Sequence, residues 1–292
     1  MEVSETPSPA VQRRRLRAEL RRARLDAGLT QEQVAAAMDW SLSKLIRIEN
    51  GSVGISTNDL RAILLHYKIT DEGRTSELLA LSRAARQRSW WSTYSDSAPP
   101  RLLQLIEYEA AAFIARNFQP LLVPGLLQTE EYARTSTRQL APQMAASRVE
   151  ALVEIRMKRQ ELLRRSDAPL LFFVMDEAVV RRAVGGQDVM RRQLQRMVEV
   201  ADAPNVTIEV VPFTAGLFPG LQGQFLIYEF SDAADDDVLY LEDARGALLS
   251  RDSPDEVLSF REEFEQLREA SLGPEGSVDL LRALIDESAH TT

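Results

Sequence analysis

The chain has 292 residues, of which 45% are hydrophobic and 27% charged, enough for two domains with apolar cores. It contains no cysteine, which excludes disulfides and thiolate metal sites, and only His66 and His290, too few for a histidine metal site or catalytic triad. No apolar run reaches the roughly 20 residues of a membrane-spanning helix, and the first ten residues are unlike a signal peptide. We expect a cytoplasmic protein without a cofactor.

The charge is unevenly distributed along the chain. The formal net charge of -9 argues by itself against a nucleic-acid partner. Residues 1–93, however, hold 15 Lys or Arg against 11 Asp or Glu, about +4, whereas residues 94–292 hold 20 against 33, about -13. This asymmetry predicts a first domain that binds DNA, associated with the nucleoid, and an acidic second domain that favours another partner.

The first expected helix is rich in arginine. Its basic residues are Arg13, Arg14, Arg15, Arg17, Arg21, Arg22 and Arg24. Arg14 and Arg15 are our candidates for phosphate contacts, which make DNA binding strongly salt-dependent. A solvated helical face is the alternative for any single arginine.

The segment 29–51 carries the clearest functional signal. Thr30 and Gln33 form a capping box, so a helix begins at Gln31, and Val34 and Met38 give it an apolar stripe with the small Ala35 at a close approach. Asp39 stands where the turn requires a positive φ, which Asp tolerates better than most residues.

A second short helix follows this turn. Ser41 caps it, Leu45 and Ile48 face inward, and Gly51 supplies the left-handed residue after its end. This predicts Ser43, Lys44 and Arg47 on the solvent side. The two helices together have the pattern of a helix-turn-helix, and an ordinary helical hairpin with a solvated polar face is the alternative.

A helix-turn-helix places its second helix in the major groove of DNA. We therefore expect DNA contacts at the start and along the outer face of that helix, from Ser41, Leu42, Ser43, Lys44 and Arg47. Arg47 and Lys44 are the main candidates because Arg or Lys grips guanine O6 and N7, whereas Leu42 offers apolar contact to a thymine methyl. Gln31, at a helix N-terminus, is a candidate phosphate or base contact.

Residues 13–84 resemble the Cro/cI-type helix-turn-helix domain in its XRE-like bacterial branch. The residues that carry the resemblance are Arg24, Leu29, Thr30, Gln31, Ala35, Ser41, Ser43, Lys44 and the run Arg47–Gly51. The resemblance implies a structural pair between Arg24 and Glu49. Asp39 in the turn departs from the family pattern.

Two more helices complete a five-helix first domain. Thr57-Asn58-Asp59 opens one with Leu60, Ile63, Leu64 and Tyr67 inward, and Thr70-Asp71 opens another that runs to about Ser89. A polar, proline-bearing stretch then marks the domain joint. The expected domains are residues 11–90 for DNA binding, 91–103 as linker and 104–288 for regulation or partner binding.

The second domain alternates helical and strand-like patterns, which predicts a mixed α/β fold with a largely antiparallel sheet. We expect helices at 102–116, 129–139, 146–166, 187–201, 254–271 and 276–288, and strands at 170–175, 206–212, 224–230, 238–242 and 247–250. The acidic run 231–237 is most simply a hairpin loop, since its spacing differs from that of a calcium loop.

We expect no enzyme. The carboxylate pairs Glu107/Glu109, Asp176/Glu177 and Glu242/Asp243 are adjacent acids of the kind that is usually solvated, and nothing places two across a cleft. The glycines of residues 215–223 lack the setting of a phosphate or dinucleotide loop, and no nucleophile-elbow motif is present.

Residues 104–288 resemble the C-terminal domain of WhiJ-like actinobacterial regulators. The resemblance rests on residues 118–134, Arg156, Arg159, Gln160, and the segments 175–186 and 206–225. It implies a transcription factor of development or secondary metabolism that engages a small BldB-like protein encoded nearby, in pairs that resemble a toxin with its antitoxin.

Two hypotheses remain open for the second domain: a protein-binding regulatory module, or a pocket that senses a small ligand. The apolar segments 123–127 and 217–221 suit either, or simply the core. An exposed apolar patch would favour a protein partner, and a closed pocket with converging polar groups a ligand. We also expect a homodimer on a palindromic operator, because one module usually reads only half a site.

Overall fold

The computed structural model describes residues 9–51, 53–87, 89–231, 237–242, 248–251 and 253–289. Its contacts divide the chain into two compact units, Met1–Ser92 with Phe230–Asp236, and Thr93–Glu229 with Asp237–Thr292. The main division falls inside the stretch that we expected as linker, residues 91–103. Residues 90–94 form a short 3-10 helix, η1 (Trp90–Tyr94).

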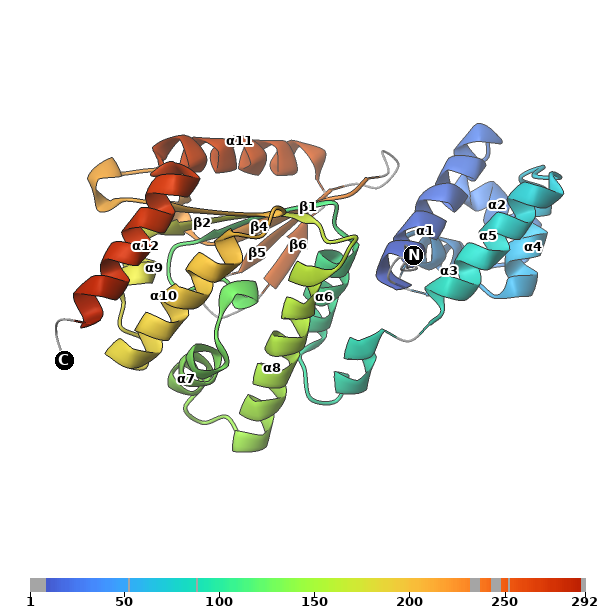
Figure 1. Cartoon of the computed structure of the whole chain (residues 1–292). Coiled ribbons are helices and arrows are strands. Elements are labelled where there is room, and N and C mark those ends of the chain that lie inside the picture. The colour runs from blue at the N-terminus through green and yellow to red at the C-terminus, as the bar shows by residue number, and fades with distance from the viewer. Residues whose placement is uncertain are drawn as a thin grey trace, which may run out of the picture. The chain divides into compact units, whose positions relative to one another are not determined.

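The described part of the first unit is helical. Its helices are α1 (Pro9–Asp26), α2 (Gln31–Ala37), α3 (Leu42–Glu49), α4 (Thr57–His66) and α5 (Glu72–Ala85) (Figure 1). Their inward faces share one core, in which Val34, Leu45 and Leu60 are fully buried. The predicted helical domain is confirmed, although α5 ends at Ala85 rather than near Ser89.

The described part of the second unit contains seven α-helices and six strands. The helices are α6 (Pro100–Ala111), α7 (Glu130–Leu140), α8 (Ala146–Arg159), α9 (Glu177–Arg181), α10 (Gln187–Ala201), α11 (Pro254–Ala270) and α12 (Gly273–Ala289). The strands are β1 (Ile114–Gln119), β2 (Leu170–Asp176), β3 (Val206–Val211), β4 (Phe225–Glu229), β5 (Val238–Glu242) and β6 (Leu248–Arg251).

The strands form one mixed sheet in the order β3-β2-β1-β4-β5-β6. β1 pairs parallel with β2 and β2 parallel with β3, whereas β4 joins β1 antiparallel and continues antiparallel through β5 to β6. The prediction of a largely antiparallel sheet is therefore wrong. The two strands of a hairpin are close in sequence, so their antiparallel pairing can be predicted from the turn between them. Parallel strands are joined by long crossover connections, so the sequence near each strand does not reveal its pairing.

The strand β1 was missed altogether, because residues 102–116 were predicted as one helix. The helix α6 ends at Ala111, and β1 runs between β2 and β4 in the middle of the sheet. The charged Arg116 within β1 made the strand difficult to predict, because a charged residue is unusual in a central strand. Its guanidinium is neutralised by Glu229 at 2.6 Å and lies over the rings of Phe172 and Phe264.

Helices cover both faces of the sheet (Figure 1). α11 packs on one face over a cluster that includes Phe118, Phe225 and Phe264, and α6, α8 and α10 lie on the other. α12 packs against α10 and the edge strand β3. The buried Ser277 of α12 accepts a hydrogen bond from the N–H of Val210 at 2.8 Å, which occupies a backbone donor on the open edge. Over the described residues, no helix has the length and apolar character needed to span a membrane.

Candidate nucleic-acid interface

The helix α2 begins where the capping box predicts. The N–H of Gln33 donates to Oγ1 of Thr30 at 3.2 Å, and the N–H of Thr30 donates to Oε1 of Gln33 at 2.8 Å. Two backbone donors that the helix itself leaves unused are thereby satisfied. This fixes the first residue of α2 as Gln31.

The turn between α2 and α3 also forms as predicted. Asp39 has φ of 54°, the left-handed conformation expected for it, and the next residue, Trp40, donates its N–H to the carbonyl of Ala35 at 2.9 Å. The chain then enters α3 at Ser41, whose hydroxyl accepts from the N–H of Lys44 at 3.2 Å. Asp in this position therefore builds the turn without glycine.

Core packing and polar contacts together hold α2 and α3 at a fixed angle. Val34 and Ala35 of α2 and Leu45 and Ile48 of α3 are buried in the same cluster.

At the far end of α3, Gly51 has φ of 78°, and a Cβ there would lie 2.6 Å from Cδ of Arg17. The positive φ favours glycine, and any larger residue would also have to displace the Arg17 side chain.

The pair implied by the first resemblance is present. Nε of Arg24 donates to Oε1 of Glu49 at 2.7 Å and Nη2 donates to Oε2 at 3.2 Å, with both side chains largely buried. The hydrogen bond to Glu49 raises the pKa of Arg24. Nη1 of Arg24 also donates to the carbonyl of Leu29 at 2.9 Å, so one guanidinium joins the end of α1, the entry to α2 and the end of α3.

Gln31 belongs to the same network. Its Nε2 donates to Oε2 of Glu49 at 2.7 Å, which uses one of the two N–H bonds of the amide. The residue that we proposed as a DNA contact is thus also a structural link between the first residue of α2 and the last of α3. A change at Gln31 will act on both helices, not only on a ligand.

The outer face of α3 is as the sequence predicts for most positions. Ser41, Leu42, Ser43 and Arg47 are exposed, and Nε of Arg47 donates to the carbonyl of Ser43 at 3.3 Å. These side chains leave the helix on the side away from its core contacts.

Lys44 lies differently from its neighbours. It is half-buried, with Nζ 3.3 Å from Oδ2 of Asp59 and 4.0 Å from the centre of the Trp40 ring. Neither contact was foreseen, because Asp59 enters only through the placement of α4. The ammonium group of Lys44 therefore already interacts with Asp59 of α4 and with the Trp40 ring.

The two candidate arginines of α1 differ in exposure. Arg15 has an exposed side chain whose Nη2 lies 3.1 Å from Oε1 of Glu77 in α5. Arg14 is only 7% exposed. Of the two, Arg15 is the one with surface to offer a phosphate.

One exposed residue of α3 was missed by sequence reasoning. Ile46 is 39% exposed, one helical turn after Leu42. The signal that finds it is its spacing: four residues beyond Leu42, it must share the outward face.

In the second unit, the apolar segment 123–127 belongs to the core. Val123 and Leu127 are buried, and the side chain of Gln193 in α10 donates to the carbonyl of Leu127 at 2.8 Å and accepts from the N–H of Thr129 at 2.7 Å. Arg156 of α8 donates to Oε1 of Gln128 at 3.0 Å, and Gln160, the residue after α8, donates to the Gln128 carbonyl at 2.6 Å. Of the uses considered for this segment, the structure supports the core.

The carboxylates of the second unit hold protein groups. Glu109 forms a buried bidentate pair with Arg159, at 3.0 and 2.7 Å. Burial alone would lower the pKa of Arg159, but the charge and hydrogen bonds of Glu109 raise it, so the guanidinium stays charged. Asp176 caps α9 through the N–H of Ala178, and Glu177 accepts from the N–H of Phe213 at 2.7 Å.

Two other sequence features fall partly outside the described residues. They are the acidic run 231–237, of which 232–236 are not described, and the pair Glu242/Asp243, of which Asp243 is not. His290 also lies outside them. Among the residues that are described, no group of three or more acidic, His or Cys side chains forms a metal site.

The loop between β3 and β4 exposes apolar side chains. Phe213 is 57% exposed and Leu217 is 93% exposed. Gly220 anchors the same loop, since a Cβ there would lie 2.5 Å from Cε1 of Phe118. The loop is therefore fixed at one point and presents two large apolar groups beside it.

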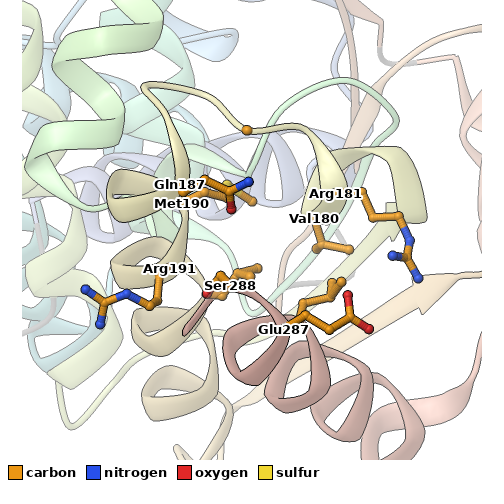
Figure 2. Close-up of a pocket in the computed structure, with 10 residues that line it drawn as sticks. Val180, Arg181, Gln187, Met190, Arg191, Glu287 and Ser288 are labelled. Carbon is orange, nitrogen blue, oxygen red and sulfur yellow. The ribbon is translucent and has the colours of Figure 1, made fainter. Parts of the chain in front are cut away.

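A cavity of about 210 Å³ lies between α9, α10 and the last turns of α12. Val180, Met190 and Leu284 contribute apolar walls, and Figure 2 shows Arg181 and Arg191 on opposite sides. Each arginine is paired with a carboxylate that is not part of the lining, Arg181 with Glu177 at 2.6 Å and Arg191 with Asp188 at 3.3 Å. Their charges do not converge on the cavity.

Two family models match the chain. Residues 15–78 match a helix-turn-helix domain, and residues 102–283, more than half of the chain, match a domain of unknown function, DUF5753. The chain belongs to the DUF5753 family. The comparisons with curated proteins and with solved structures found no match. The N-terminal match supports a DNA-binding transcriptional regulator, and the DUF5753 match gives the second unit a family without an activity.

Proposed function

We propose that this DUF5753 protein is a sequence-specific transcriptional regulator that reads DNA with α3 and is controlled through its second unit. The observation that carries the proposal is the outer face of α3, where Leu42, Ser43 and Arg47 are exposed while Leu45 and Ile48 lock the opposite face into the core. A helix held in this way fits the major groove, with its N-terminal residues at the base edges.

The contacts divide into two kinds. Arg47 grips guanine O6 and N7, and the hydroxyls of Ser41 and Ser43 bond base edges or phosphates near the start of α3. Gln31 and Arg15, with Arg14 as the weaker candidate, contact the DNA backbone and fix the register. Lys44, paired with Asp59, adds charge beside the groove.

Selection of duplexes from a random library by the full-length protein tests this function. We expect a defined site whose affinity falls steeply with salt, because phosphate contacts release counterions. Arg47→Ala should cost about 1–3 kcal/mol on that site and relax one base position, whereas Arg15→Ala should weaken all duplexes alike. Arg282→Ala, an exposed position of the second unit, is the control and should change neither. No binding to any duplex at low salt would refute the proposal.

The regulator acts as a homodimer on a palindromic operator in this proposal. One α3 spans only a few base pairs, and two copies reach half-sites about 34 Å apart. Footprinting of the selected duplex should show two protected half-sites at that spacing. A single protected half-site bound by a monomer would contradict the dimer while leaving DNA reading intact.

We also propose that the second unit binds a small BldB-like protein. The regulator would then act in the control of development or secondary metabolism in an actinobacterial cytoplasm. The exposed Phe213 and Leu217 support a protein partner, since large apolar groups in one loop suit a protein surface. Co-expression with a small protein encoded nearby tests it: Leu217→Ser should abolish co-purification, and Leu258→Ser, an exposed leucine of α11, should not. Retention of the partner by Leu217→Ser would exclude this loop.

Ligand sensing is the second candidate, and the cavity shown in Figure 2 is the observation in its favour. A metabolite bound there would contact α10 and α12 together and raise the unfolding temperature. Ala183→Trp, which fills the cavity, should abolish that rise. A library of host metabolites that leaves the unfolding temperature unchanged would remove this candidate.

A further inference from the structure

The exposed face of α3 consists of two parallel rows of side chains. Leu42 and Ile46 stand one turn apart and are 37% and 39% exposed. Ser43 and Arg47 form the neighbouring row, also one turn apart. Because residues four apart lie above each other on a helix, the face is divided lengthwise into an apolar and a polar half.

Among the described residues, neither Leu42 nor Ile46 belongs to the core cluster of its unit. Leu45 and Ile48, the core residues of this helix, are at most 4% exposed, so the Leu42/Ile46 row lies beside the buried face and not within it. Single exposed leucines are ordinary on protein surfaces. Here, however, two large aliphatic side chains lie next to each other on the face that the proposed function brings to DNA. Such a surface suits contact with an apolar group in the groove.

The major groove offers one such feature. Thymine alone among the four bases carries a C5 methyl group at the groove edge, and Leu or Ile reads it by van der Waals contact. The two cations of α3 lie away from this row. Nζ of Lys44 contacts Asp59 and the Trp40 ring, and Nε of Arg47 donates to the carbonyl of Ser43 in the polar row.

We propose that Leu42 and Ile46 form a methyl-reading row that selects thymines in the operator, beside the base that Arg47 reads by hydrogen bonds. This inference rests on the proposed function and makes it more specific. It assigns part of the base preference to contacts that involve no hydrogen bond, and it gives Ile46 a role that polar motif analysis overlooks.

Replacement of thymine by deoxyuridine tests the row directly, because it removes the C5 methyl and leaves every hydrogen-bonding edge in place. The full-length protein is used with the duplex that it selects, and each thymine is replaced in turn. We expect affinity to fall about fourfold at each thymine whose methyl is buried, the effect of one methyl-sized group removed from water. Thymines outside the half-sites should show no change.

The variants Ile46→Ala and Leu42→Ala identify the residues responsible. Each should bind the thymine duplex more weakly and lose its sensitivity to deoxyuridine at one position, since the group that met the methyl is gone. Leu65→Ala is the matched control, an aliphatic side chain of α4 that is 69% exposed, and should discriminate as the unaltered protein does. Both test positions are exposed, so the unfolding temperatures should stay within a few degrees.

The outcomes separate the two proposals. If no duplex is selected, DNA reading itself fails. If a duplex is selected but deoxyuridine has no effect at any position, or both α3 variants discriminate like the unaltered protein, the methyl-reading row is wrong and the apolar row serves a protein contact instead. Loss of discrimination in both variants, each at one base position, establishes the row, whereas loss in Leu42→Ala alone would contradict the role of Ile46.

Discussion

Each unit of the protein contains a buried arginine–glutamate pair, and the two pairs position different things. Arg24 and Glu49 meet at 2.7 and 3.2 Å in the first unit, and Arg159 and Glu109 at 3.0 and 2.7 Å in the second. The side chains of both pairs are at least nine-tenths buried. Their geometry is nearly the same, so their surroundings make the difference.

The first pair lies directly behind the candidate DNA-binding surface. It ties together the end of α1, the first residue of α2 and the last residue of α3, with Gln31 as a third member. The second pair joins α6 to α8 beside the buried Tyr228 and Tyr240. A buried ion pair adds little net stability compared with apolar packing, but it fixes where its two backbones sit. Under the proposed function the first pair would position the DNA-reading helix, whereas the second supports the packing of α6 on α8.

The largest effect should come from the second pair. Glu109→Ala leaves the Arg159 charge uncompensated inside the domain and should cost about 3–5 kcal/mol of unfolding free energy. Hydrogen exchange of the full chain should show the loss in α6, α8 and the strands β4 and β5 that carry Tyr228 and Tyr240. Glu150→Ala, at an exposed carboxylate that pairs with Arg134 and Arg138, is the control and should cost at most about 1 kcal/mol. Equal losses of unfolding free energy in the two variants would mean that the buried pair contributes no more to stability than an exposed one.

Glu49→Ala should have a somewhat smaller effect on stability and a larger one on DNA binding. The loss should be near the lower end of the range, about 3 kcal/mol, because Arg24 keeps its bond to the Leu29 carbonyl. Glu72→Ala, at an exposed carboxylate in the first turn of α5, is the control and should change neither property by more than about 1 kcal/mol. If Glu49→Ala left both the unfolding temperature and the selected-duplex affinity unchanged, the pair would have no positioning role.

The first unit was the more predictable of the two because its signals are local. Thr30, Asp39 and Ser41 each act on backbone groups within a few residues, so the helix starts and the turn follow from the sequence. The position of Lys44 was not predictable, since Asp59 approaches it only when α4 packs in place. A local pattern defines which face of α3 is exposed, but not which of its charges are shared.

The second unit was less predictable because its decisive contacts are long-range. The strand β1 carries Arg116, which suits a central strand only when Glu229 neutralises it from β4, 113 residues later. The same holds for the segment 123–127, in which the carbonyls of Gly125 and Leu127 accept from the side chains of Gln160, just after α8, and of Gln193 in α10. Its apolar sequence was compatible with a surface or a core, and only these distant glutamines decide between the two.

The smallest predicted effect contrasts two buried tyrosines beside the second ion pair. The Tyr240 hydroxyl donates to the carbonyl of Arg101 at 2.8 Å, whereas the Tyr228 hydroxyl has no hydrogen-bond partner among the described residues. Burial raises the pKa of Tyr228, so its hydroxyl stays protonated at neutral pH and its desolvation is not offset by any bond.

Tyr240→Phe should therefore cost about 1 kcal/mol, while Tyr228→Phe should be neutral or slightly stabilising. Both changes remove one oxygen from a buried ring and leave the packing intact, so each serves as the control for the other in chemical unfolding of the full chain. A greater loss for Tyr228→Phe than for Tyr240→Phe would reverse the assignment. It would mean that the hydroxyl beside Glu109 and Arg159 is bonded in solution, and that the second pair extends into a larger polar network.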